Sequence, residues 1–243
     1  MNRQAQSAVL FLIGASMLHA SSTDLYLRYV KAGLRPLLIV AGVVLIATAL
    51  ATVWYELRQG RSKGHDHGGE PGHTHREPRI SWLLVLPLFA LVLVAPPALG
   101  SYSAMHAGTA LQRPWGYADL PDGDPLPLSA VDYAGRAAYD QGRGLAGRRV
   151  EITGFIALDS TGTPYLVRME LSCCAADAQP VKIGLTGQLP PVLEPDNWLK
   201  VTGAYTAKRT KDPVNGGLIP FLHVTATQPI PTPKDPYESG WRG

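Results

Sequence analysis

The chain has 243 residues, of which 46% are apolar and only 17% are charged. This charged fraction lies below the roughly 25% that is usual for soluble domains, which favours a membrane protein. The formal net charge is +3, and it comes from residues 1–103, which carry +4, while residues 104–243 are nearly neutral at −1. Because no folded domain concentrates positive charge, we expect no nucleic-acid binding. The two cysteines are also too few for a disulfide scaffold.

Three uncharged, apolar stretches occur in the first part of the chain, at about residues 5–22, 36–55 and 81–99. A helix needs about 20 apolar residues to cross the hydrocarbon core of a membrane, and the second and third stretches meet this requirement clearly. The first stretch follows Arg3 and resembles a signal peptide, but Leu18 and His19 make a poor cleavage site. We therefore expect residues 1–103 to form a transmembrane region with three spans, or two if the first is removed.

The basic residues in the loops predict the orientation of these spans. The loop at 56–79 holds five Lys and Arg, whereas the loop at 21–36 holds three. Basic loops tend to stay on the cytoplasmic side, so the 56–79 loop should lie inside the cell. We therefore expect a multi-pass protein of the cell membrane whose C-terminal domain is extracytoplasmic.

The 56–79 loop is also rich in histidine and contains His65, His67, His73 and His75. Imidazole binds zinc and similar borderline ions, and the neighbouring glycines would let the chain wrap around one. The loop is therefore a candidate zinc site. The alternative is a solvated polar hairpin between two spans, without a physiological role in metal binding.

Residues 104–147 contain many Pro and Gly and predict a linker with one helix. Ser129 is followed three residues later by Asp132, which resembles a capping box, so we expect this helix at about 130–141. Further on, β-branched and apolar residues alternate between turns that contain Gly or Pro. Five strands are expected, at 150–158, 164–171, 181–185, 197–208 and 218–226.

Five short strands in succession are typical of a small barrel, which removes most exposed sheet edges. The expected fold is therefore a membrane α-helical N-terminal part plus a mainly-β C-terminal domain at 148–243, a small OB-like barrel of five strands. Gly154 and Gly203 suit sharp bends or bulges in this barrel.

Cys173 and Cys174 are adjacent, and Asp177 follows three residues later. Neighbouring residues on a strand point to opposite faces, so the two thiols can hold one metal ion only where the chain bends. Three alternatives are open: a strained vicinal disulfide, one reactive or ligating thiol beside a buried one, or two inert packed thiols. Spacing alone favours the inert pair.

Common catalytic motifs are missing from the sequence. It contains no Cys-x-x-Cys, no nucleophile elbow, no phosphate-binding Gly loop and no zinc-protease helix, and we expect no enzyme. The three apolar stretches also lack Asp, Glu, Lys and Arg, which ion-coupled carriers usually bury at membrane depth. Three such spans would make a poor transporter acting alone.

Four strings of sequence resemble a known family: GRRVEITGFIAL at 147–158, RMELSCCAAD at 168–177, PDNWLKVTGAY at 195–205 and PIPTPKDPYE at 229–238. Over nearly its whole length the chain resembles the YcgQ-like family of bacterial permease subunits, whose conserved domain has no assigned function. The resemblance implies a larger multi-span permease as partner and an association with metal homeostasis. It also marks Cys173, Cys174 and Asp177 as a family motif without an assigned role.

The sequence therefore predicts an accessory membrane subunit of a two-component permease. Its extracytoplasmic β-domain would capture or gate the substrate, in metal homeostasis and with zinc as the candidate ion. The alternative is a free-standing, membrane-anchored module that binds or senses metal. An extracytoplasmic thiol enzyme is a weaker hypothesis, because no base neighbours the cysteines.

Overall fold

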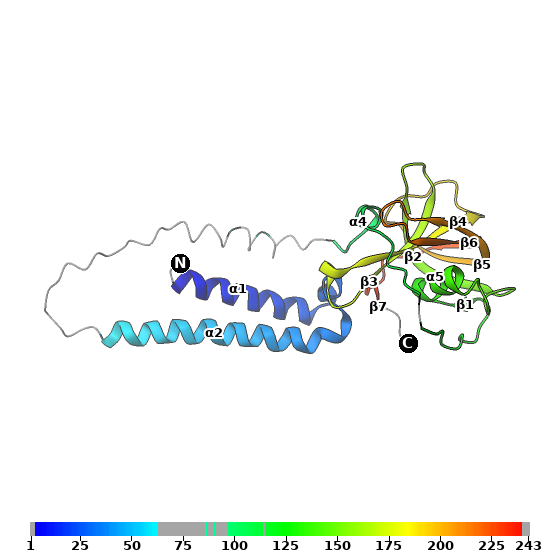
Figure 1. Cartoon of the computed structure of the whole chain (residues 1–243). Coiled ribbons are helices and arrows are strands. Elements are labelled where there is room, and N and C mark those ends of the chain that lie inside the picture. Colours follow the sequence, from blue (N-terminus) through cyan, green and yellow to red (C-terminus); the bar gives the residue numbers. More distant parts are fainter. Residues whose placement is uncertain (1–2, 63–85, 87–89, 91–96, 114, 240–243) are drawn as a thin grey trace. The chain divides into compact units, whose positions relative to one another are not determined.

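The computed structural model describes residues 3–62, 86, 90, 97–113 and 115–239 (Figure 1). The chain forms two compact units. The first consists of Met1–Tyr26 and Gly33–Pro97, and the second of Leu27–Ala32 and Ala98–Gly243. The short segment Leu27–Ala32 thus packs with the C-terminal part of the chain, although in the sequence it lies between two parts of the first unit.

The first unit contains two helices that pack side by side, α1 at Arg3–Ser22 and α2 at Arg35–Ser62 (Figure 1). Glycines permit their close approach, since a Cβ atom added at Gly14 would lie 2.8 Å from the carbonyl oxygen of Gly42. Both helices are long and apolar enough to cross a membrane. Their apolar windows are only 22% and 11% buried, whereas the core helix of a soluble protein would be mostly covered.

Two of the three expected spans thus correspond to described helices. The third, at 81–99, lies outside the described residues apart from positions 86, 90 and 97–99. The loop that carries His65, His67, His73 and His75 lies outside them entirely.

The second unit is built around a closed barrel of five strands: β2 at Arg149–Leu158, β3 at Pro164–Leu171, β4 at Gln179–Gly187, β5 at Trp198–Lys211 and β6 at Leu218–Pro229. The order around the barrel is β2-β5-β6-β4-β3, and β3 pairs with β2 to close it. Neighbours are antiparallel except for β4 and β6, which run parallel. The five expected strands and the OB-like barrel are confirmed.

Two glycines mark close backbone approaches in the barrel wall. The register between β5 and β6 shifts between Thr202 and Gly203, so Gly203 lies at a bulge, as expected. A Cβ atom there would lie 2.5 Å from the backbone oxygen of His223. At Gly154 an added Cβ would lie 2.7 Å from the backbone oxygen of Val167, so both positions require glycine.

Helix α5 at Ala130–Tyr139 contacts four barrel strands, β2, β4, β5 and β6. Ser129 caps the helix by accepting a hydrogen bond from the N–H of Asp132, at 2.9 Å. The buried face of α5, with Tyr133 fully enclosed, joins one apolar core with inward residues of the strands such as Ile152. The sequence assigns this region to a linker, whereas in the structure α5 completes the core of the barrel unit.

The outer face of β2 and β3 is covered by other parts of the same unit. Helix α4 at Ser101–His106 contacts both strands, and the short strand β7 at Tyr237–Ser239 pairs in parallel with β3. A second apolar cluster forms there, which includes Ala104, Met169 and Tyr237. The short strand β1 at Leu126–Pro127 pairs in parallel with β2.

Candidate metal site

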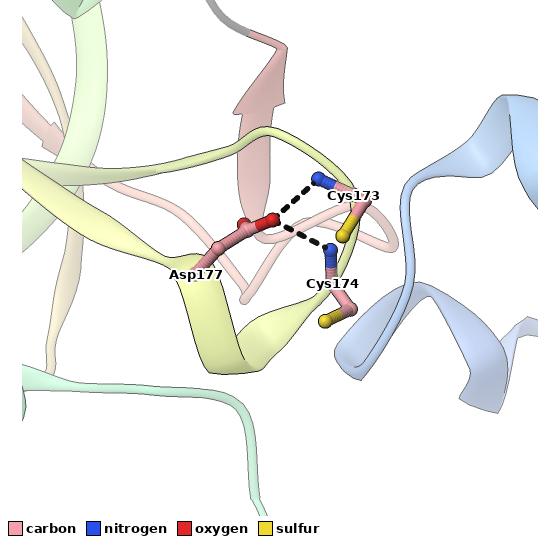
Figure 2. A group of neighbouring side chains, drawn as sticks. All are labelled: Cys173, Cys174 and Asp177. Carbon is pink, nitrogen blue, oxygen red and sulfur yellow. Dashed lines mark hydrogen bonds between the residues drawn. The ribbon is translucent and has the colours of Figure 1, made fainter.

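The loop between β3 and β4 brings Cys173, Cys174 and Asp177 together (Figure 2). Strand β3 ends at Leu171, and a single 3-10 turn, η4 at Ala175–Asp177, leads the chain back toward β4. Both thiol sulfurs and a carboxylate oxygen lie within 4.8 Å of one another. Within the described ranges, no other group of three His, Cys, Asp or Glu side chains is placed to hold a metal ion.

Asp177 shapes this loop. Its carboxylate accepts hydrogen bonds from the backbone N–H groups of Ser172, Cys173 and Cys174, at 3.0, 2.8 and 3.4 Å. The N–H of Asp177 in turn donates to the Cys174 side chain, which completes a capping box. Three N–H groups on one carboxylate curl the chain, so the rule that adjacent strand residues point apart does not apply here.

The same hydrogen bonds set the protonation of the loop. A hydrogen bond to Asp177, followed by one to Cys174, raises the pKa of the Cys173 thiol to about 11. The hydrogen bond from Cys173 also lowers the pKa of Asp177, with help from the backbone N–H groups. At neutral pH a protonated Cys173 therefore lies beside an ionised Asp177. Such a thiol is a poor nucleophile, and a metal ion must displace its proton.

The exposure of the cysteines bears on the three alternatives that the sequence leaves open. Both cysteines are free, so no vicinal disulfide joins them in this structure. Cys173 is exposed and Cys174 is half-buried, whereas an inert packed pair requires two buried thiols. The geometry is nearest to the second alternative, in which one thiol can act as a ligand, with the difference that Cys174 is half-buried and not fully buried.

The β3–β4 loop is also hydrogen-bonded to residues 27–32, which belong to the same unit. The N–H of Lys31 donates to the Cys173 carbonyl at 3.1 Å, and the N–H of Ala175 donates to the Tyr29 carbonyl at 2.7 Å. These two bonds flank an antiparallel bridge between Val30 and Cys174. Sequence reasoning missed this pairing, because a bridge of one residue leaves no periodic pattern in the chain.

A cavity of about 880 Å³ opens beside the loop. Ser172 and Asp177 form part of its wall. The rest of the wall comes from residues 110–113 and 115–118, from α5 and from strand ends that carry Glu170 and Gln179. Asp177 therefore borders both the two thiols and a space of the size that small ligands occupy.

The barrel region is similar to a known protein family. Residues 136–238 match the family model described as the DUF1980 C-terminal domain. The matched region of the DUF1980 C-terminal domain includes all five barrel strands and the three residues of the candidate site. At the level of this domain, the match is consistent with the resemblance to the YcgQ-like family. No curated protein and no solved structure matches the chain.

Proposed function

We propose that this chain is an accessory membrane subunit of a two-component permease, and that its barrel domain captures or gates a metal ion at Cys173, Cys174 and Asp177. The observation that carries the proposal is the meeting of two sulfurs and one carboxylate oxygen within 4.8 Å on an accessible loop. The resemblance to the YcgQ-like family adds the expectation of a larger permease as partner.

The three ligand atoms select the class of metal. Thiolate sulfur is soft and carboxylate oxygen is hard, and this combination suits a borderline ion such as zinc better than magnesium or calcium. A structural zinc site normally has four protein ligands. Three ligands leave one position open, which suits an ion that is captured and then passed on.

The membrane part of the proposal rests on the helices of the first unit. The surface of α2 exposes large apolar side chains that water would not cover favourably, among them Leu37, Val40, Val44, Leu50, Trp54 and Leu57. Neither of the apolar stretches that α1 and α2 contain carries a charged residue, so they lack the groups with which carriers bind ions at membrane depth. We therefore assign anchoring to these helices, and the transport path to the partner.

The path of the chain supports an extracytoplasmic barrel. Residues 27–32 pack with the barrel and lead within a few residues to the start of α2. If α2 crosses the membrane, the barrel shares a side with the start of α2, and the loop at 56–79 lies on the opposite side. The chain must then cross once more before Ala98, where the stretch at 81–99 is expected to span. This order agrees with the basic residues that place the 56–79 loop inside.

A reporter enzyme fused after Gly243 should therefore behave as exported, and the same reporter inserted in the 56–79 loop should behave as cytoplasmic. Each fusion should carry two reporter enzymes, one that is active only outside the cytoplasm and one that is active only inside it. The ratio of the two activities then gives the side of the membrane on which each position lies. Cytoplasmic activity at Gly243 would contradict the orientation, and with it the role of the barrel on the outer face.

Substitution of the candidate ligands tests capture directly. Cys173→Ser, Cys174→Ser and Asp177→Asn should each lower zinc transport or zinc tolerance of cells by about tenfold or more, measured per membrane-inserted molecule. Ser172→Ala is the matched control, because it changes the same loop and keeps the backbone N–H that bonds to Asp177. Wild-type activity in all three ligand variants would end the capture hypothesis.

A free-standing metal-binding or sensing module is the second candidate, since all three ligands of the site come from one chain. The two functions differ in their need for a partner. Mass spectrometry of the proteins that co-purify after detergent extraction separates them: a permease subunit should carry a multi-span protein with it, and a free-standing module should bind zinc alone.

A further inference from the structure

The loop that carries the thiols is also the loop that holds the connection between α1 and α2. The two backbone hydrogen bonds of Lys31 and Ala175, together with the Val30–Cys174 bridge, join this connection to the loop on both sides of Cys174. Lys31 lies four residues before Arg35, where α2 begins. Since an extended chain spans at most about 3.6 Å per residue, this distance is no more than about 14 Å.

A second contact fixes the same connection to the barrel. The hydroxyl of Tyr237, on β7, donates to the Arg28 carbonyl at 2.9 Å and accepts from the N–H of Leu99 at 3.1 Å. Tyr237 is buried, and its strand pairs with β3, the strand that leads into the thiol loop. One hydroxyl therefore bonds both to Arg28, in the α1–α2 connection, and to Leu99, at the end of the third apolar stretch.

We propose that zinc bound at Cys173, Cys174 and Asp177 tightens the hold of the thiol loop on residues 27–32, so that occupancy of the site is coupled to the connection between α1 and α2. This inference rests on the proposed function. It adds that metal binding in the barrel is coupled to the segment that connects the two membrane helices.

The expected contraction of the loop explains the coupling. Zinc lies about 2.3 Å from sulfur and about 2.0–2.2 Å from carboxylate oxygen, so its tetrahedral ligands are less than about 4 Å apart. The three ligand atoms lie within 4.8 Å of one another, so zinc would draw in any pair that is farther apart than about 4 Å and would hold the others in place. The backbones of Cys173 and Ala175 are hydrogen-bonded to residues 27–32. A bound ion that restrains the thiol loop therefore also restrains residues 27–32.

Coupling between two sites is reciprocal in free energy. If zinc stabilises the pairing with residues 27–32, then an event that displaces this connection must weaken zinc binding by the same factor. A permease that shifts α1 or α2 when it docks would thereby release the ion from the barrel.

Hydrogen exchange of the full chain in detergent, with and without zinc, tests the first half of this coupling. Zinc should slow exchange of the Lys31 and Ala175 amides about tenfold or more, because both donate across the pairing. In the Cys173→Ser/Cys174→Ser variant, zinc should leave both rates unchanged. Equal rates with and without zinc in the wild-type chain would overturn the inference.

The second half is tested by a variant that leaves all three ligands intact. Tyr237→Phe removes the hydroxyl that holds Arg28, and it should raise the zinc dissociation constant about three- to tenfold. Tyr165→Phe is the control, because Tyr165 is similarly buried and, among the described residues, its hydroxyl bonds to Asp159, away from the loop. This control should bind zinc like the wild-type chain.

The outcomes separate the two proposals. If the wild-type chain binds zinc through its cysteines, but Tyr237→Phe binds it equally well and the amides do not respond, the coupling is wrong and the metal site stands. If the wild-type chain binds no zinc through Cys173 and Cys174, the proposed function is wrong, and the coupling that rests on it is wrong too.

Discussion

Replacing Cys173 and Cys174 together with serine is expected to weaken zinc binding at least about 100-fold. Loss of groups that only orient a ligand already costs metal sites about 10–100-fold in affinity, and here two of the three ligand atoms are removed. Serine keeps nearly the same size and leaves the backbone N–H groups that bond to Asp177 in place. The loop should therefore fold, while its metal affinity is lost.

The measurement needs a background without the histidine loop, which is a second predicted zinc site. Calorimetry under reducing conditions should compare the cysteine pair with the serine pair in a chain where His65, His67, His73 and His75 are replaced by alanine. In this background the remaining affinity belongs to the barrel. Equal affinities of the cysteine and serine chains would contradict a metal site in the β3–β4 loop.

The same comparison predicts a pH dependence. Zinc must displace the Cys173 proton, and the hydrogen bond to Asp177 raises the pKa of this thiol to about 11. Below that pKa, each displaced proton makes the apparent affinity rise about tenfold for each unit of pH. Affinity should therefore increase steadily from pH 6 to 8 in the cysteine chain. A site made of histidine would lose affinity mainly below about pH 6, near the ordinary pKa of imidazole.

The barrel was predictable from the sequence because each strand alternates or carries β-branched residues between clear turns. The residues at which the strands end were harder to predict. β5 continues to Lys211 and β6 to Pro229, beyond the expected 208 and 226. Both extensions are maintained by backbone pairing of β5 with β6, as between Lys211 and Leu218, and such pairing leaves no apolar pattern in exposed residues.

The candidate site was predictable only in its residue types. Cys173, Cys174 and Asp177 are visible in the sequence, but their convergence depends on one carboxylate that accepts three N–H groups. The bridge to Val30 joins residues more than 140 positions apart, and no local pattern announces it. Strands can be predicted from local residue propensities. Hydrogen bonds from a side chain to the backbone of its own loop cannot, because they depend on the three-dimensional path of the loop.

The burial of Lys182 could not be predicted from the sequence either. This residue lies in the apolar run of β4, where a lysine would ordinarily extend into solvent. In the structure its side chain is 1% exposed, and its Nζ donates to Asp212 Oδ2 and to the Ala107 carbonyl, both at 2.8 Å. Asp212 itself is fully buried and also accepts the N–H groups of Thr109 and Val214. The pair thus ties β4 to the β5–β6 turn and to the chain that follows α4.

Lys182→Met is therefore expected to lower the free energy of unfolding of the barrel by about 3–5 kcal/mol, because it leaves the Asp212 carboxylate buried without its countercharge. For a unit of this size, that loss corresponds to a Tm lower by roughly 6–20 °C. Thermal unfolding followed by near-ultraviolet circular dichroism measures it. Arg149→Met is the control: the Arg149–Asp124 pair has nearly the same length, 2.9 Å, but side chains that are 58% and 66% exposed. Its loss should leave the free energy of unfolding nearly unchanged, because water screens an exposed ion pair.

The double variant Lys182→Met/Asp212→Asn separates the charge from the packing. Asparagine no longer needs a countercharge, and its one side-chain oxygen can still accept the N–H of either Thr109 or Val214. The double variant should therefore be more stable than the sum of the two single changes predicts. Strict additivity, or a cost for Lys182→Met no larger than that for Arg149→Met, would contradict a stabilising buried pair. Zinc affinity should stay at the wild-type level in every folded variant of this set, because the side-chain hydrogen bonds of Lys182 and Asp212 in the described structure go to Ala107, Thr109 and Val214, outside the cysteine loop and residues 27–32.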